Sequence, residues 1–155
     1  MDKRFADVIS SLDPSLRKLL AMSPVTTTTL PREMPKAGIY LFSEGERHLY
    51  VGRSNNICGR LKRHSTPGAT HRMAAFAFRL AREATGKVKA TYTTKGSRAE
   101  LMKDEKFRKA FNDAKARIRK MDVRFVEEAN PVRQAILELY VAVVLPTDYN
   151  DFDNH

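Results

Sequence analysis

The stretch GIYLFSEGERHLYVG, residues 38–52, decides the fold of this chain of 155 residues. Two runs of aliphatic and aromatic residues flank the turn Glu44-Gly45-Glu46, a pattern typical of a β-hairpin. With a three-residue turn, Tyr40 lies directly opposite Tyr50 and Ser43 pairs with Arg47. An even-length turn would instead place the two phenols on opposite faces of the sheet.

The predicted pairing gives each face of the hairpin a different character. One face carries the two tyrosines together with Phe42 and His48. The other face carries aliphatic residues that are expected to meet the core, which are Ile39, Leu41, Leu49 and Val51. Tyrosine also favours strands for its packing alone, so neither tyrosine by itself indicates chemistry.

The segments before the hairpin predict an N-terminal helical arm and linker over residues 1–36. Helices are expected over 4–12 and 14–22, the second with Asp13 as its N-cap and Pro14 at its first position. Residues 23–36 contain three prolines and are expected to be extended along the domain edge.

The segments after the hairpin predict five further helices and one strand. Asn55 is expected to cap a helix that reaches about residue 64, and Gly86 is expected to end a helix over 73–84. Helices are also predicted over 97–102 and 103–120, followed by a strand over 122–127. Asn130 and Pro131 begin a last helix, which Pro146 ends, and 151–155 form a tail.

The charge is unevenly distributed along the chain. There are 28 basic and 18 acidic residues, a net charge of +10. Residues 1–64 carry +5, residues 65–120 carry +10 and residues 121–155 carry −5. Such a basic excess favours a polyanionic partner such as nucleic acid or a membrane surface.

The apolar pattern and the single cysteine bear on location. No apolar run approaches the roughly 20 residues of a membrane helix, and Asp7 interrupts any signal-like start. Cys58 cannot form an internal disulfide, and no Cys/His cluster suggests structural zinc. We therefore expect a soluble, cytoplasmic protein without membrane association.

The helix after the hairpin collects cations that could bind phosphate. Arg60 and His64 are four residues apart and therefore share a face, and Arg53 comes just before the helix. Guanidinium groups, an imidazole and free backbone N–H groups form a plausible phosphate cradle, although a solvated basic helix has the same pattern. Lys62 and Arg63 are expected to be solvated or to contact DNA backbone.

The helix from Pro131 is apolar nearly all round, and Glu138 is its only acidic residue. A helix of this kind is expected to be mostly buried. A buried carboxylate there needs a cation, an arginine or a divalent metal. The alternative is that Glu138 reaches solvent along one exposed stripe.

These residues together resemble the GIY-YIG nucleases. Gly38-Ile39-Tyr40 matches the first signature, and Tyr50-Val51-Gly52 matches the second with Val for the commoner Ile. Arg60 follows Tyr50 by ten residues, His64 occupies the His or Tyr position, and Glu138 and Asn150 match the late Glu and Asn. The resemblance covers 37–64 and 122–150 but neither 1–36 nor most of 65–120, and Arg53 replaces a lysine that many relatives carry.

The resemblance implies an α/β (α+β) fold. Its central three-stranded antiparallel sheet would be flanked by helices within a nuclease domain over 37–150, with a basic helical insertion at about 65–120. It also implies hydrolysis of DNA phosphodiesters with one divalent ion, leaving a 5′-phosphate and a 3′-hydroxyl.

Residue roles follow from the same resemblance. Glu138 would hold Mg²⁺ or Mn²⁺, while Arg60 and Arg53 would neutralise the phosphoryl oxygens. Tyr50 or Tyr40 would position or deprotonate the attacking water, with His64 as the rival base. The supporting residues would be Gly38, Gly52 and Asn150.

Two readings of function remain open at this point. The first is a DNA endonuclease acting on duplex or branched DNA, with dimerisation as one route to double-strand cleavage. The second is a nucleic-acid-binding module that keeps the scaffold without catalysis. A steep salt dependence of binding without any cleavage would favour the second.

Overall fold

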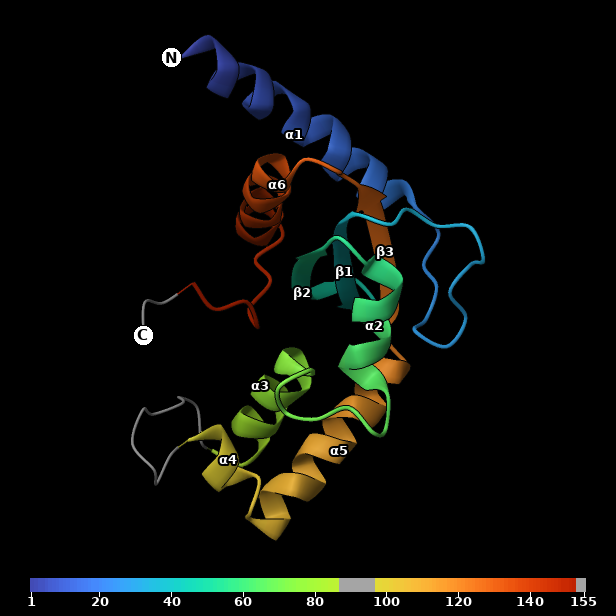
Figure 1. The fold of residues 1–155 in the computed structure, drawn as a ribbon, viewed down its shortest axis with the longest axis vertical. Coiled ribbons are helices and arrows are strands. Elements are labelled where there is room, and N and C mark those ends of the chain that lie inside the picture. Colours follow the sequence, from blue (N-terminus) through green and yellow to red (C-terminus); the bar gives the residue numbers. More distant parts are fainter. Residues whose placement is uncertain (87–96, 153–155) are drawn as a thin grey trace. The chain divides into compact units, whose positions relative to one another are not determined.

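The computed structural model describes residues 1–86 and 97–152, and its contacts divide the chain into two units (Figure 1). Unit 1 comprises Met1–Arg60 and Met121–His155, and unit 2 comprises Leu61–Lys120. In the described residues, no helix has both the length and the apolar character needed to span a membrane.

Unit 1 is built on a three-stranded antiparallel sheet, as expected. Its strands are β1 (Gly38–Glu44), β2 (Arg47–Ser54) and β3 (Asp122–Glu127), in the order β2-β1-β3. β1 is the central strand, and every one of its residues from Gly38 to Ser43 is buried. The strands and the helices around them make the fold α+β.

The hairpin differs from the predicted register. Glu44 pairs with Arg47, so the turn has two residues, and Gly45 adopts a left-handed φ of 60° that suits such a turn. A bulge between Phe42 and Ser43 then shifts the pairing by one residue. Tyr40 therefore lies opposite Gly52, and the predicted pairs Tyr40 with Tyr50 and Ser43 with Arg47 are wrong.

The bulge nevertheless leaves both tyrosines on one face. Beyond it, Phe42 pairs with Tyr50 and Tyr40 pairs with Gly52. Residues directly opposite each other project to the same side, and alternate residues of a strand share a side. The predicted place of His48 is wrong, because it pairs with Ser43, which points away from Phe42; the Ser43 Oγ and His48 Nδ1 atoms are 2.7 Å apart.

The N-terminal segment forms one helix, α1 (Lys3–Ala21), where two were expected. Asp2, not Asp13, accepts hydrogen bonds from the backbone of Arg4 and Phe5 and caps its start. Pro14 lies inside the helix and removes one backbone hydrogen bond. The apolar stripe continues past it through buried leucines, so packing holds the helix together across the proline.

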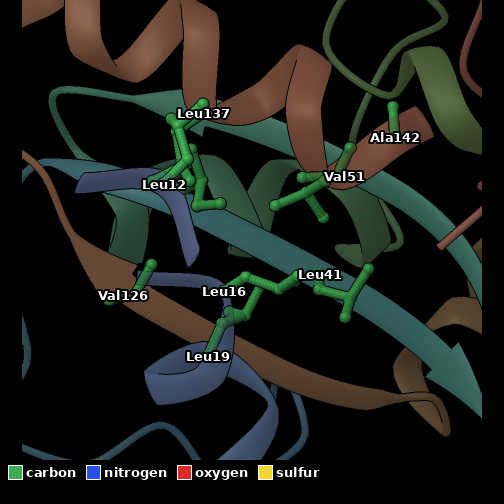
Figure 2. Packing of buried hydrophobic residues seen from close by; sticks show 10 residues of the cluster. Leu12, Leu16, Leu19, Leu41, Val51, Val126, Leu137 and Ala142 are labelled. Atoms are coloured by element: carbon green, nitrogen blue, oxygen red, sulfur yellow. The ribbon is translucent and has the colours of Figure 1, made fainter. Parts of the chain in front are cut away.

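That stripe packs on the aliphatic face of the sheet together with the last helix, α6 (Pro131–Val144) (Figure 2). The cluster combines residues of α1, the sheet and α6, including Leu12, Leu16 and Leu19, then Ile39, Leu41, Val51 and Val126, then Leu137, Val141 and Ala142. The segment expected to form an N-terminal arm thus supplies part of the core.

The helix α6 begins as predicted, with Asn130 accepting hydrogen bonds from the backbone of Val132 and Arg133. The expectation that it is mostly buried is wrong on one side. Val132 and Val143 are 64% and 71% exposed, whereas Leu137 and Val141 are buried. In the described residues α6 therefore buries one face against the sheet and leaves an apolar face uncovered.

The helix α2 (Ile57–Ser65) starts one residue later than expected. Asn56, not Asn55, caps it by accepting a hydrogen bond from the backbone of Gly59. The boundary between the two units falls inside α2, so Arg60 belongs to unit 1 and His64 to unit 2.

Unit 2 is helical, as predicted for the basic interval. It contains the end of α2 and α3 (Ala75–Ala84), α4 (Arg98–Leu101) and α5 (Glu105–Arg119). Phe78 of α3 contacts Phe107 and Phe111 of α5, with ring centroids 5.1 and 6.3 Å apart. Lys115 is buried, and its ammonium donates hydrogen bonds to the carbonyls of Pro67 and Ala69.

Candidate active site

The first signature tyrosine, Tyr40, is packed against a glycine of the neighbouring strand. An alanine Cβ at Gly52 would lie 2.3 Å from the Tyr40 Oη atom and 2.4 Å from its Cζ atom. The ring also meets Phe42 edge-on, at 5.8 Å between centroids. Gly52 is thus required for the place of the Tyr40 ring, which gives the two signature motifs a direct physical link.

Four of the predicted site residues come together at the Tyr40 phenol. Burial is the largest cause that raises the pKa of Tyr40, and the nearby phenol of Tyr50 raises it further. The Arg60 side chain lowers that pKa through its charge and a hydrogen bond, and Glu138 raises it slightly. These side chains come from β1, β2, α2 and α6, all within unit 1.

Glu138 faces a cation, as a half-buried carboxylate requires. Burial raises the pKa of its carboxyl, while the charge of Arg53 and a hydrogen bond from the Arg53 backbone lower it. An arginine is thus one partner of this carboxylate. Arg53 itself is exposed at the end of β2, so its guanidinium can also reach a ligand in solvent.

Asn150 fastens the C-terminal segment to β2. Its Oδ1 accepts from the Val51 N–H at 2.9 Å, and its Nδ2 donates to the Val51 carbonyl at 2.7 Å. The Tyr149 N–H donates to the Leu49 carbonyl. β2 is an edge strand, so these bonds satisfy backbone groups that the sheet leaves open, on either side of Tyr50.

The first motif glycine has a steric role. A Cβ at Gly38 would lie 2.0 Å from the Val126 carbonyl oxygen, and its φ of 155° disfavours other residues. Gly38 therefore lets β1 approach β3 closely where β1 begins, which fixes the start of the strand that carries Tyr40.

Three predicted residues lie in unit 2. Lys62 and Arg63 are exposed on α2, as expected for solvated or DNA-contacting side chains. His64 is fully buried, and its ring meets Phe76 edge-on at 6.5 Å between centroids. The structure thus places His64 inside unit 2, packed against α3.

Gln134 is a positioning residue on the buried side of α6 that the sequence motifs do not include. It is buried, and its Nε2 donates to the Asn55 Oδ1 at 3.0 Å and to the Glu128 carbonyl at 2.6 Å. It thereby ties α6, which carries Glu138, to the loop that leads into α2. A lone amide on the buried side of an apolar helix is the signal for such a role.

A divalent ion would find one carboxylate here. In the described part of the chain, no three His, Cys, Asp or Glu side chains form a group that could enclose a metal. Mg²⁺ keeps several waters and is usually held by one or two carboxylates together with substrate phosphates. Glu138 can make that limited contribution, whereas the described residues form no closed, all-protein metal site.

Comparison of the chain with protein-family models, with curated proteins and with solved structures gives no match.

Proposed function

We propose that this chain is a DNA endonuclease of the GIY-YIG type that hydrolyses phosphodiester bonds and acts inside the cell. The observation that carries the proposal is the convergence at Tyr40 of a second phenol, the Arg60 guanidinium and the Glu138 carboxylate. These residues are 98 positions apart at the extremes and come from four elements. Core packing alone requires no such mixture of chemical groups.

The two tyrosines differ in what they can do. Burial raises the pKa of Tyr40, so its phenol stays protonated at neutral pH and can donate a hydrogen bond but not take a proton. Tyr50 is only half-buried. We assign to Tyr50 the contact with the attacking water. We assign to Tyr40 the role of orienting the Arg60 guanidinium, its hydrogen-bond partner.

The arginines supply positive charge where a phosphoryl group would gain negative charge. Arg60 interacts with the Tyr40 phenol through its charge and a hydrogen bond, and this contact would orient the guanidinium before substrate arrives. Arg53 lies beside Glu138 and remains exposed. Guanidinium groups bind phosphate oxygens in a bidentate manner, and an arginine does not lose its proton, so neither is a base.

Glu138 would hold Mg²⁺ or Mn²⁺. When bound, the ion stabilises charge on the scissile phosphate and on the leaving oxygen. The products would be a 5′-phosphate and a 3′-hydroxyl. One site cuts one strand per visit, so cleavage of both strands would need a homodimer or two events.

The test is nicking of supercoiled plasmid by wild type, Glu138→Ala and the control Glu127→Ala, with Mg²⁺, Mn²⁺ or a chelator. Glu127 is an exposed carboxylate at the end of β3. Because loss of an outer-shell partner already costs about 10–100-fold at metal sites, loss of the ligand is expected to reduce nicking at least ~100-fold. Glu127→Ala is expected to nick like wild type.

Two outcomes contradict the proposal. If Glu138→Ala nicks plasmid as fast as wild type, the Glu138 carboxylate takes no part in the reaction. Wild type that binds duplex, branched and single-stranded DNA, with a steep salt dependence, but cuts none of them is a binding module and not an enzyme.

A further inference from the structure

The net charge of the chain resides in unit 2. Unit 1 has 11 basic and 13 acidic residues, a net charge of −2, although it contains the candidate active site. Unit 2 has 17 basic and 5 acidic residues, a net charge of +12. A polyanion is therefore attracted to unit 2 far more strongly than to the surroundings of the proposed chemistry.

Within unit 2, cations gather around one aromatic ring. The guanidinium carbons of Arg98 and Arg82 lie 5.1 and 5.6 Å from the centroid of the Phe78 ring. The His71 ring is 6.2 Å from the same ring. We call His71, Phe78, Arg82 and Arg98, together with Arg79, whose charge acts on Arg82, the Phe78 cluster; it joins α3 and α4 with the loop before α3.

The cations of this cluster act on one another. Burial is the largest cause that lowers the pKa of Arg82, and the charges of Arg98 and Arg79 lower it further. Burial, Arg72 and Arg98 lower the pKa of His71. The cations of the cluster therefore lie close enough to lower one another's pKa.

Packing alone explains this arrangement poorly. A cation–π contact contributes about 0.5–1 kcal/mol at exposed sites, and one arginine would suffice to make it. Lys115 shows how this unit buries a cation for structure: it pairs the ammonium with two backbone carbonyls and the face of Phe111. In the Phe78 cluster, three guanidinium groups lie close together and raise the local positive potential.

We propose that the Phe78 cluster binds a phosphate of the nucleic-acid backbone and anchors the substrate on unit 2. This proposal rests on the nucleic-acid partner of the proposed function and deepens it. Guanidinium groups held on an aromatic face are pre-oriented, so less conformational entropy is lost when they bind phosphate oxygens. The anion in turn offsets the mutual repulsion of the cluster.

The first experiment measures binding of a fluorescein-labelled duplex of about 30 base pairs in EDTA as a function of salt. Arg98→Gln and Arg79→Gln/Arg98→Gln are compared with Lys3→Gln/Lys18→Gln, which removes the same charge from α1 of unit 1. Each lost phosphate contact reduces the slope of log K against log salt by about 0.9. We expect weaker binding by both variants, a reduction in slope of ~0.9 for the double variant, which loses the one phosphate contact, a reduction of up to ~0.9 for the single variant, and no change in slope for the control.

The second experiment uses only wild type, so that it does not depend on how a variant folds. Phenylglyoxal modifies accessible arginines, and mass spectrometry measures each site with and without the duplex. Arg98 and Arg79 are expected to be protected by DNA, while Arg32 in the linker is not. Protection of the two residues by inorganic phosphate at the same ionic strength would show that a single phosphate group suffices; protection by DNA alone would show that the polymer is needed.

Unchanged slopes for the cluster variants, or absence of DNA protection at Arg98 and Arg79, overturns the proposal. Binding in EDTA is independent of cleavage. A result that contradicts the phosphate-binding role of the cluster can therefore be told apart from one that contradicts the proposed function, in which nicking is absent or insensitive to Glu138→Ala.

Discussion

Substitution of Gly52 by alanine tests the arrangement of the two tyrosine motifs. The new Cβ would lie 2.3 Å from the Tyr40 Oη atom and 2.4 Å from its Cζ atom. An ordinary contact of these atoms is about 3.5 Å, so the ring must move by roughly 1 Å. Tyr40 is only 1% exposed and packs against Phe42, so the ring cannot move without disturbing its neighbours.

The magnitude follows from these contacts. Overpacking of a filled core costs about 1–3 kcal/mol of unfolding free energy, which gives the expected loss for Gly52→Ala. A displacement of about 1 Å in a catalytic site can cost ~100-fold in rate, so plasmid nicking is expected to fall by about that factor. Urea unfolding measures the first quantity and the initial rate of nicking measures the second.

The matched control is Gly68→Ala. A Cβ at Gly68 meets no atom within 4 Å, and its φ is not in the left-handed region. Its effect on both stability and nicking is expected to be small. Gly52→Ala with the same unfolding free energy and the same nicking rate as Gly68→Ala would refute the reasoning about Tyr40.

Two other predictions concern the C-terminal segment and the carboxylate. Asn150→Ala removes two hydrogen bonds to Val51, each contributing roughly 0.5–1.5 kcal/mol, so it is expected to lower the free energy of unfolding in urea by about 1–3 kcal/mol. A loss no larger than that of the exposed Asp151→Ala would contradict the role of these bonds, the C-terminal clasp, in fastening the C-terminal segment to β2. Burial raises the pKa of Glu138 in the folded state, so its contribution to stability is present below the unfolded-state pKa and is lost as pH rises through the folded-state pKa. Glu138→Gln is therefore expected to stabilise the protein at pH 7 and not at pH 3, and equal effects at the two pH values would be inconsistent with this.

The sequence predicted the elements well where local signals agree. The strand over 122–127 and the start of α6 at Asn130 are found where capping and alternation placed them. The predicted helix start at Pro14 is wrong. Local propensity favours a start there, but the leucines on both sides of Pro14 pack into the same core and keep one helix continuous. Tertiary packing thus outweighed the local signal.

The hairpin shows a limit of a different kind. The turn residues gave the place of the reversal but not its length, and nothing in HLYVG marks a bulge. Its position follows from packing on both faces, since Val51 must meet the core while Tyr50 stays with Tyr40 and Phe42. The shared face of the tyrosines was correctly expected, but through a wrong pairing.

The candidate site was expected mainly from the resemblance, and its contacts needed the structure. Spacing could place Arg60 and His64 on one helix face, but not the buried surroundings of His64 or the hydrogen bond from Arg60 to Tyr40. The Phe78 cluster was not foreseen. Its members are separated in sequence, and only the packing of α3 and α4 brings Arg98 to the ring.

The C-terminal clasp has a consequence for association in concentrated solution. A small sheet with two open edges invites strands of other copies to add to it, the first step of β-aggregation. On the β2 edge, Asn150 and Tyr149 occupy backbone groups of Val51 and Leu49. On the β3 edge, Val25 of the linker exchanges backbone hydrogen bonds with Val123. Segments from outside the sheet thus shield both edges of the sheet that presents the tyrosines.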